Sequence, residues 1–248
     1  VEIEQFTLRA LASRLGFSTE EPLATNFTSG GAEANHTAFV AAFARAIPTY
    51  PDAGLFGSSV RPTVYLSEEA HASFQKSAQT TGVGRDALRF VAVDSAWRMR
   101  VRALRERIAQ DRASGATPVM LIATAGTTGA GAIDPLSELA EVARTEGMWF
   151  HVDAAWGGVA ALSPKTAALL DGIARADSVT WDAHKGLSVA MGAGMFFCRH
   201  PDVLRALFKV EAPYIQRDDD GDRVQPYTST AQWSRRFIGL KVFLSLAT

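Results

Sequence analysis

The feature of this sequence that most limits its fold is a regular alternation of short apolar runs with longer segments of helical periodicity. The short runs read as strands and cover residues 63–66, 88–93, 119–123, 149–152, 178–181 and 195–198. Helical patterns cover residues 34–46, 71–80, 97–113, 135–146 and 201–208. Strands that are apolar at nearly every position are buried on both faces, and helices that cross over between them make their pairing parallel. The pattern predicts an α/β fold, with a mostly parallel sheet and helices on both faces.

The composition favours one large folded domain and argues against a main role in binding nucleic acid. Hydrophobic residues make up 47% of the chain and charged residues 21%, which is enough apolar material for a substantial core. The formal net charge of −1 does not suit a protein that tracks a phosphate backbone. Segment 97–113 is rich in arginine, but Glu106 and Asp111 interrupt it, so a solvated outer face is the favoured interpretation.

Cysteine content, hydropathy and histidine spacing indicate a cytoplasmic protein without a metal site or a membrane span. The single cysteine, Cys198, lies in an apolar run, which excludes an internal disulfide and is typical of a buried small side chain. Segment 237–247 is apolar but is interrupted by Lys241 and Ser245, and it is shorter than the roughly 18 residues that a span needs. The histidines show no paired ligand spacing.

The chain begins at Val1 without a methionine or a signal-peptide pattern, so we expect the sequence to be part of a longer protein.

In an open parallel sheet, ligands bind beyond the carboxyl ends of the strands, so the residues that follow each strand are the candidates for a binding site. Residues 28–35 lead directly into an alanine-rich helix. Gly30 and Gly31 would let backbone amides converge at the start of that helix, which is a ready site for a phosphate. An ordinary turn explains a Gly-Gly pair equally well.

Asp153 lies at the end of the apolar strand 149–152 and is followed by small residues, which would let a flat ligand approach closely. A carboxylate in such a dry position needs a cationic or hydrogen-bonding partner. A protonated pyridine nitrogen would serve, and a salt bridge to an arginine is the alternative.

Lys185 and His71 follow two other strands and would lie at the same edge of the sheet. A desolvated lysine has a lowered pKa, and its neutral amine can attack an aldehyde. A histidine that begins the helix 71–80 could stack on a planar ligand or sense a substrate carboxylate. Each residue taken alone is also compatible with an ordinary surface position.

Together these motifs resemble the group II pyridoxal phosphate (PLP)-dependent amino-acid decarboxylases, which include the aromatic-amino-acid, glutamate, histidine and diaminobutyrate enzymes. The Gly-Gly turn, His71, Gly126-Thr-Thr128, His151-Val-Asp-Ala-Ala155 and His184-Lys185 occur in the family's order and approximate spacing over nearly the whole chain. The resemblance implies that residues 1–248 form the large domain of a fold type I PLP enzyme. It also implies that the start and a smaller C-terminal domain lie outside this sequence.

The resemblance assigns a role to each motif residue. Lys185 would bind PLP as a Schiff base, Asp153 would pair with the ring nitrogen, and His71 would stack on the ring. The other implied cofactor contacts are backbone amides of Gly30, Gly31 and Ala32 to the phosphate, Thr128 and Ala155 near the ring, and His184 beside the lysine. Asp182 belongs to this set although many relatives have asparagine there, and Gly186 replaces a bulky residue of many relatives.

The implied reaction is decarboxylation of an L-amino acid, with an aromatic substrate as the first expectation, in a homodimer. A loop tyrosine would protonate the product carbanion, and both Tyr214 and Tyr227 match it, on either side of the polar run 216–225, which suits a mobile lid. Aldehyde synthesis, other lyase chemistry, transamination and an inactive cofactor-binding fragment are the alternatives. A nucleotide-binding Rossmann domain is disfavoured because no Gly-x-Gly-x-x-Gly follows the first strand.

Overall fold

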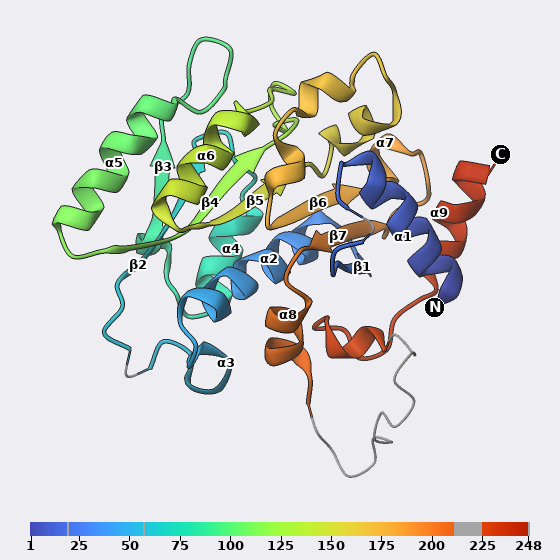
Figure 1. The fold of residues 1–248 in the computed structure, drawn as a ribbon, viewed down its shortest axis with the longest axis horizontal. Coiled ribbons are helices and arrows are strands. Elements are labelled where there is room, and N and C mark those ends of the chain that lie inside the picture. Colours follow the sequence, from blue (N-terminus) through green and yellow to red (C-terminus); the bar gives the residue numbers. More distant parts are fainter. Residues whose placement is uncertain (19, 57, 211–224, 248) are drawn as a thin grey trace.

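The computed structural model describes residues 1–18, 20–56, 58–210 and 225–247. Within them the strands form one seven-stranded sheet in the order β1-β7-β6-β5-β4-β2-β3 (Figure 1). The strands are β1 (Ala24–Thr28), β2 (Pro62–Ser67), β3 (Leu88–Val91), β4 (Thr117–Thr124), β5 (Trp149–Asp153), β6 (Ser178–Asp182) and β7 (Gly194–Cys198). Strands β3, β2, β4, β5 and β6 pair in parallel, whereas β7 is antiparallel to both β6 and β1. The prediction of a mostly parallel sheet is confirmed.

Helices cover both faces of this sheet, as the sequence predicts (Figure 1). One face carries α2 (Gly31–Ala46), α4 (Ser73–Thr80) and α8 (Pro201–Phe208), with the short α3 (Tyr50–Ala53) beside them. The other carries α1 (Glu2–Arg14), α5 (Val101–Ala113), α6 (Leu136–Glu146) and α9 (Ile238–Ala247). Short α7 (Ala183–Gly186) follows β6, and 3₁₀ turns lie at Arg85–Ala87, Gly157–Leu162, Ala167–Leu170, Ile173–Arg175 and Pro226–Thr228.

Helices α4 and α5 begin two and four residues later than their periodicity predicts. Helix α5 begins at Val101 and not at Trp97, because the carboxylate of Asp94 accepts the backbone N–H groups of Ala96 and Arg98 and closes a turn. Such a side chain competes with the helix for backbone donors. Helix α4 begins at Ser73, so His71 precedes the helix and does not start it.

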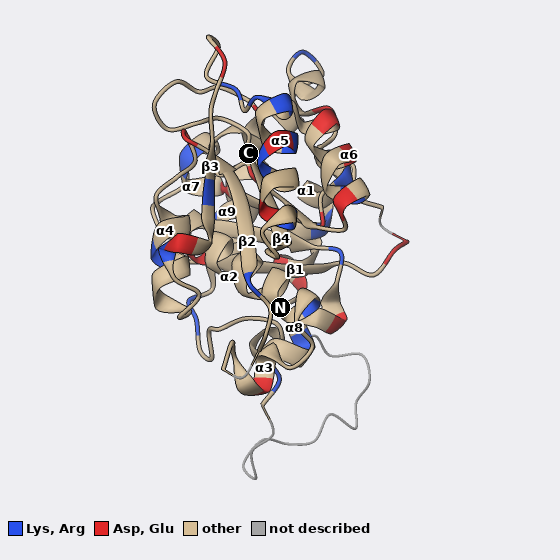
Figure 2. Ribbon diagram, turned by 90° about the vertical axis from the view of Figure 1, so that its left-hand side faces the viewer, with Lys and Arg blue, Asp and Glu red and all other residues tan. Residues whose placement is uncertain are grey.

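Charged side chains of both signs mix on α5 and α6 (Figure 2). Arg102 pairs with Glu106, and Arg112 of α5 pairs with Glu146 of α6. The arginine-rich helix is therefore part of a mixed, solvent-facing surface.

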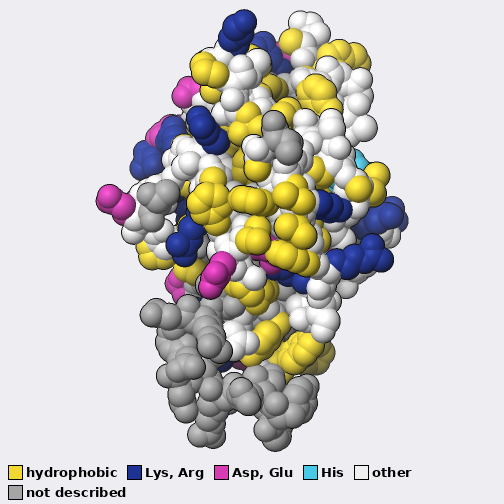
Figure 3. Space-filling model, turned by 90° about the vertical axis from the view of Figure 1, so that its right-hand side faces the viewer, with side chains coloured by type: hydrophobic (Ala, Val, Ile, Leu, Met, Phe, Trp, Pro, Cys, Tyr) yellow, Lys and Arg dark blue, Asp and Glu magenta, His cyan; other side chains and the backbone are white. Residues whose placement is uncertain are grey.

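The two ends of the described chain lie side by side, where α1 packs against α9 (Figure 1). Buried Glu4 accepts hydrogen bonds from both terminal nitrogens of Arg235, at 2.9 and 2.5 Å, and from the backbone N–H of Gly239. Apolar side chains gather on the surface at this side of the molecule (Figure 3), where Phe6, Leu240 and Leu244 are exposed. None of the helices in the described part of the chain is long and apolar enough to cross a membrane.

Candidate active site

A pocket at the carboxyl ends of β4, β5 and β6 brings together the motif residues from five separate parts of the sequence. Its lining includes the predicted residues Gly31, Ala32, His71, Thr128, Asp153, Ala155 and Lys185. Asn35, Thr124, Gly126 and Trp156 complete the lining. These residues, which the sequence predicts to bind a ligand, therefore lie together at this edge of the sheet.

Asp153 ends β5 and is almost fully buried, with 4% of its surface exposed. Its carboxylate accepts the side-chain N–H of Asn35 at 2.7 Å and the backbone N–H of Ala155 at 3.1 Å. Burial raises the pKa of this carboxyl above its usual value, and the two donors and the more distant charges of Lys185 and His71 oppose that rise. The direct donors are neutral, so the site would accommodate a cation brought by a ligand.

Lys185 lies in α7, immediately after β6, and its side chain is 40% exposed. Its amine is 3.0 Å from the carboxylate of buried Asp182, and the ring nitrogen Nε2 of His184 is 3.8 Å from the same oxygen. The amine is ion-paired and partly solvated, so the desolvation that would activate a lysine is not present in the protein alone.

The Gly-Gly turn places the start of α2 at the pocket. Gly30 is the N-cap and Gly31 the first helical residue, so the N–H groups of Gly31 and Ala32 lack acceptors within the helix, whereas Glu33 donates its N–H to the carbonyl of Gly30 at 3.1 Å. A Cβ at Gly31 would lie 2.9 Å from Asp182 Oδ2 and 3.2 Å from the Cβ of Ala155. Glycine at this position therefore permits close packing of α2 against the ends of β5 and β6.

His71 and His184 occupy different surroundings. His71 is exposed, lines the pocket, and accepts the backbone N–H of Ser73 at 3.2 Å through Nδ1. His184 accepts the backbone N–H of Ala193, also through Nδ1, at 3.1 Å, and lies next to Gly30 behind the pocket lining. His71 is therefore placed to meet a ligand directly, and His184 to support the turn that carries Lys185.

The two candidate tyrosines cannot be compared in the structure, because Tyr214 lies outside the described residues, as does most of the run 216–225. Tyr227 is half-buried and packs on Trp233, with 5.2 Å between the ring centroids. It is not among the pocket-lining residues of this chain.

Asn35 is a pocket residue that the sequence motifs do not predict. Asn35 lies one helical turn after Gly31 and is the buried polar residue between Asp153 and His151. Its position four residues from Gly31 puts both on one face of α2, and a polar side chain there within an alanine-rich helix is the signal that could have identified it.

The described residues fit PLP. A buried carboxylate with neutral donors suits a protonated ring nitrogen, the start of α2 suits a phosphate, and Ala155 presents only a small side chain to a flat ring. Lys185 supplies an amine at the same pocket.

The pyridoxal-dependent decarboxylase conserved domain matches residues 1–248. The chain therefore belongs to this decarboxylase family, which confirms the resemblance that the motifs indicate. Aspartate 1-decarboxylase of Aliivibrio fischeri is 41% identical over 207 residues, covering 79% of this chain and 38% of that protein. Human cysteine sulfinic acid decarboxylase is 36% identical over 256 residues, covering 98% and 49%. Aromatic-L-amino-acid decarboxylase of Bacillus atrophaeus is 35% identical over 247 residues, with the same coverage.

Solved structures confirm the fold. The apo form of mouse CSAD superposes with a TM-score of 0.89 at 32% identity, covering 99% of this chain and 51% of that one. Oryza sativa TDC with PLP and tryptamine superposes with a TM-score of 0.91 at 26% identity, covering 99% and 52%. The chain thus spans about half the length, or less, of the relatives it matches.

Proposed function

We propose that residues 1–248 form the PLP-binding large domain of an enzyme that converts an L-amino acid to its amine and carbon dioxide. The observation that carries this proposal is the presence of the Lys185 amine and the buried Asp153 carboxylate in one pocket. When bound, PLP supplies an electron-poor ring that accepts the electron pair released as a bond to Cα breaks. Membership of the decarboxylase family supports loss of the carboxylate as the reaction.

Asp153 would hold a proton on the ring nitrogen, because an adjacent cation stabilises a carboxylate that burial otherwise disfavours. Lys185 would form the covalent bond to the aldehyde carbon. His71 would pack on one face of the ring, and Ala155 would leave space at the other. Thr128 lines the same pocket near the proposed ring position.

Backbone amides at Gly30, Gly31 and Ala32 would hold the phosphate at the start of α2. The neighbouring carboxylate of Asp182 is then best explained as a partner for the Lys185 ammonium before the lysine reacts. His184 Nε2, 3.8 Å from Asp182, would remain beside that carboxylate once Lys185 turns to the cofactor.

Either Tyr214 or Tyr227 would protonate the carbanion, as the family resemblance implies. Substitution of each by phenylalanine distinguishes them. The variant that lacks the proton donor should form less amine and more aldehyde, while the other should keep the ratio of the unsubstituted protein.

Product analysis over a panel of amino acids tests the proposed reaction. The relatives named for aspartate, cysteine sulfinate and aromatic amino acids match at 35 to 41% identity, so the panel should contain acidic and aromatic members. We expect carbon dioxide and amine in equal amounts from at least one of them, without oxygen uptake. Aldehyde formed with oxygen uptake, or turnover without carbon dioxide, would overturn the proposed reaction.

A homodimer in the cytoplasm is part of the same proposal. The family resemblance supports the dimer, and the single, buried Cys198 suits a reducing compartment. Sedimentation of the PLP-loaded protein tests the dimer, and a mass of one subunit at all concentrations would contradict it.

A further inference from the structure

A line of buried polar side chains leads from the opposite end of β5 to the candidate active site. Trp149, His151 and Asp153 alternate along β5 and therefore share the face on which α2 packs. Between the first and the last of them the strand advances about 13 Å. Ser178 of β6 and Asn35 of α2 fill the gaps between these three side chains.

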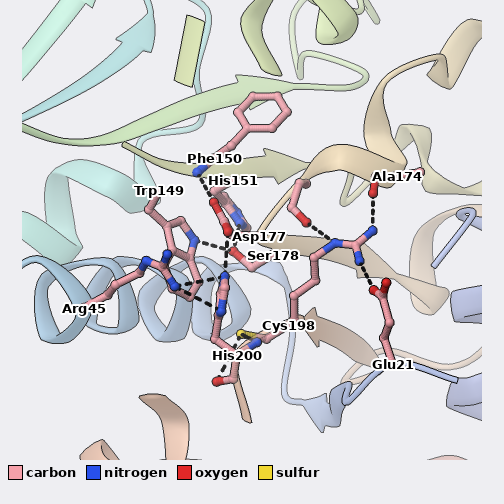
Figure 4. Close-up of polar contacts among 12 residues, drawn as sticks. Glu21, Arg45, Trp149, Phe150, His151, Ala174, Asp177, Ser178, Cys198 and His200 are labelled. Atoms are coloured by element: carbon pink, nitrogen blue, oxygen red, sulfur yellow. Dashed lines mark hydrogen bonds and ion pairs between the residues drawn. The ribbon is translucent and has the colours of Figure 1, made fainter. Parts of the chain in front are cut away.

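The contacts form one continuous chain of hydrogen bonds. Trp149 Nε1 donates to Ser178 Oγ at 2.9 Å, and that hydroxyl lies 2.8 Å from His151 Nδ1 (Figure 4). His151 Nε2 lies 3.1 Å from Asn35 Oδ1, and Asn35 Nδ2 donates to Asp153 Oδ2 at 2.7 Å. Each of these side chains is at most 4% exposed. Burial at this level makes every unpaired donor or acceptor costly.

The chemistry of the two ends fixes the direction of every bond. An indole N–H can only donate, and an ionised carboxylate can only accept. Asp153 accepts an N–H of Asn35, so Asn35 Oδ1 faces His151 and accepts its Nε2–H. The neutral ring has no second N–H, so its Nδ1 accepts the hydroxyl of Ser178, which in turn accepts the indole N–H of Trp149.

Histidine makes the arrangement specific. Burial lowers the pKa of His151 to about 3, so the ring is neutral over the working range and carries one N–H. Its ring meets that of Phe74 edge to face, and a hydrogen bond to the backbone of Ser178 opposes the effect of burial on its pKa. The other groups that act on Asp153 are the N–H of Ala155 and the more distant charges of Lys185 and His71.

We propose that Trp149, Ser178 and His151 are positioning residues that lock Asn35 with its N–H groups toward Asp153, and so keep this carboxylate ionised for a ligand cation. The inference rests on the proposed function only in taking that cation to be the protonated ring nitrogen of PLP. The orientation of Asn35 and the ionisation of Asp153 belong to the protein itself and are measurable without cofactor.

The first measurement needs no substitution. Nitrogen-15 NMR of the histidine rings in the apo protein, assigned with a His151→Gln variant, reports which ring nitrogen carries the proton. We expect the Nε2–H form of His151 as the only neutral form between pH 5 and 9. A predominant Nδ1–H form, or titration of the ring in this range, would overturn the proposal.

The second measurement follows the Asp153 carboxyl by carbon-13 NMR in apo Asn35→Ala. Loss of one hydrogen bond to a charged group should raise its titration midpoint by about one to two pH units. Ser73→Ala is the matched control, because it removes an acceptor of the same amide at 3.2 Å but leaves the chain to Asp153 intact. Its midpoint should stay at that of the unsubstituted protein, and equal shifts in the two variants would contradict the directional role.

Ser178→Ala tests the remote link. It should convert His151 to a mixture of both neutral tautomers, an effect that simple loss of packing would not produce. An unchanged Nε2–H form in this variant would show that Ser178 does not set the direction.

A final comparison separates this inference from the proposed function. In protein loaded with nitrogen-15 PLP, Asn35→Ala should lower the fraction of protonated ring nitrogen, and Asp153→Asn should abolish it. The ring-nitrogen signal could stay unchanged in both variants while the apo measurements give the expected results. That outcome would contradict the proposed role of Asp153 toward PLP but would leave the direction of the hydrogen-bond chain supported.

Discussion

Asp177 at the amino end of β5 and β6 and Asp153 at their carboxyl end differ in their partners, because Asp177 is closed by His200 and Arg45. Asp182, the other buried aspartate at the carboxyl end, pairs with Lys185. At the amino end, Asp177 accepts the backbone N–H of Phe150 at 2.7 Å and contacts His200 Nε2 at 2.6 Å (Figure 4). Arg45 stands behind that imidazole, 3.1 Å from its Nδ1. At the carboxyl end, Asp153 is more deeply buried and is bonded to neutral donors.

The difference indicates which end stabilises the fold and which end binds a ligand. The Asp177 cluster consists of Asp177, His200 and Arg45. The charge and the hydrogen bonds of Asp177 are satisfied within the chain, so removing this carboxylate should lower the stability of the protein. Asp153 bears a raised pKa from burial, and the cation that would offset it comes from outside the protein. Substitutions test this contrast between the closed carboxylate of Asp177 and the open carboxylate of Asp153.

The largest effect is expected for Lys185→Ala, which removes the amine that binds the cofactor at the open end. Decarboxylation should fall at least about 1,000-fold, because Lys185 is the one lysine among the described residues that line the pocket. Turnover with each amino acid of the panel measures it. Lys165→Ala, at an exposed position away from the pocket, should behave as the unsubstituted protein does, and equal losses in both variants would contradict the assignment.

Asp153→Asn should lower turnover about 100-fold, because a neutral amide no longer stabilises a protonated ring nitrogen. The same substitution should not lower the stability of the apo protein and can raise it. The folded-state pKa of Asp153 is raised, so its ionisation opposes folding above the unfolded-state pKa, and the penalty grows as pH rises through the folded-state value.

Urea unfolding of apo Asp153→Asn at pH 8 should therefore show stability equal to or above that of the unsubstituted protein. A clear loss of stability there would mean that Asp153 is a structural residue like Asp177.

Gly31→Ala should weaken PLP binding about tenfold, because the new Cβ meets Asp182 and Ala155 at 2.9 and 3.2 Å and displaces the start of α2. A titration of apo protein with PLP, followed by absorbance, measures the affinity. Gly129→Ala is the control, since its Cβ would make ordinary contact with Glu69 at 3.5 Å. Unchanged affinity of Gly31→Ala for PLP would show that the phosphate does not bind at this turn.

Asp177→Asn, at the closed end, should lower the free energy of unfolding by about 1.5 to 3 kcal/mol, the usual range for hydrogen bonds to a charged group. Urea unfolding measures the loss. The absorbance of bound PLP and its affinity should stay those of the unsubstituted protein. A changed spectrum would show that the two ends are coupled.

The smallest effect is expected at Cys198, which accepts the backbone N–H of His200 at 3.4 Å beside the closed cluster. Burial raises the pKa of its thiol to about 12, so almost no thiolate forms at pH 8. The folded protein should not react with a thiol reagent. The chain unfolded in urea should react with one equivalent of the reagent, at Cys198. Rapid reaction of the folded protein would show that the closed end opens readily.

Local sequence patterns predict most of the fold and the pocket around Asp153, but little of the cluster around Asp177. Apolar runs located the strands from β2 to β7, and the rule that ligands bind beyond strand ends placed Asp153 and Lys185 in one pocket. Strand β1 was missed because Thr25, Asn26 and Thr28 are polar although buried. Pairing with β7, a long-range contact, gives it its strand structure.

Long-range contacts explain the remaining omissions. Arg45 and His200 are 155 residues apart, and Asn35 and Asp153 are 118 apart, so no local period shows that they touch. The Asp182–Lys185 ion pair joins residues only three apart, yet it depends on the turn after β6 and not on a helical period of the sequence.

Borohydride reduction of the PLP-loaded protein, followed by digestion and peptide mass spectrometry, tests the central claim most directly. Reduction fixes the bond between the cofactor and whichever amine holds it. We predict one phosphopyridoxyl group per chain, on the peptide that contains Lys185, and its loss in Lys185→Ala. A label on a different lysine, or no label on a protein that still retains PLP, would contradict the account.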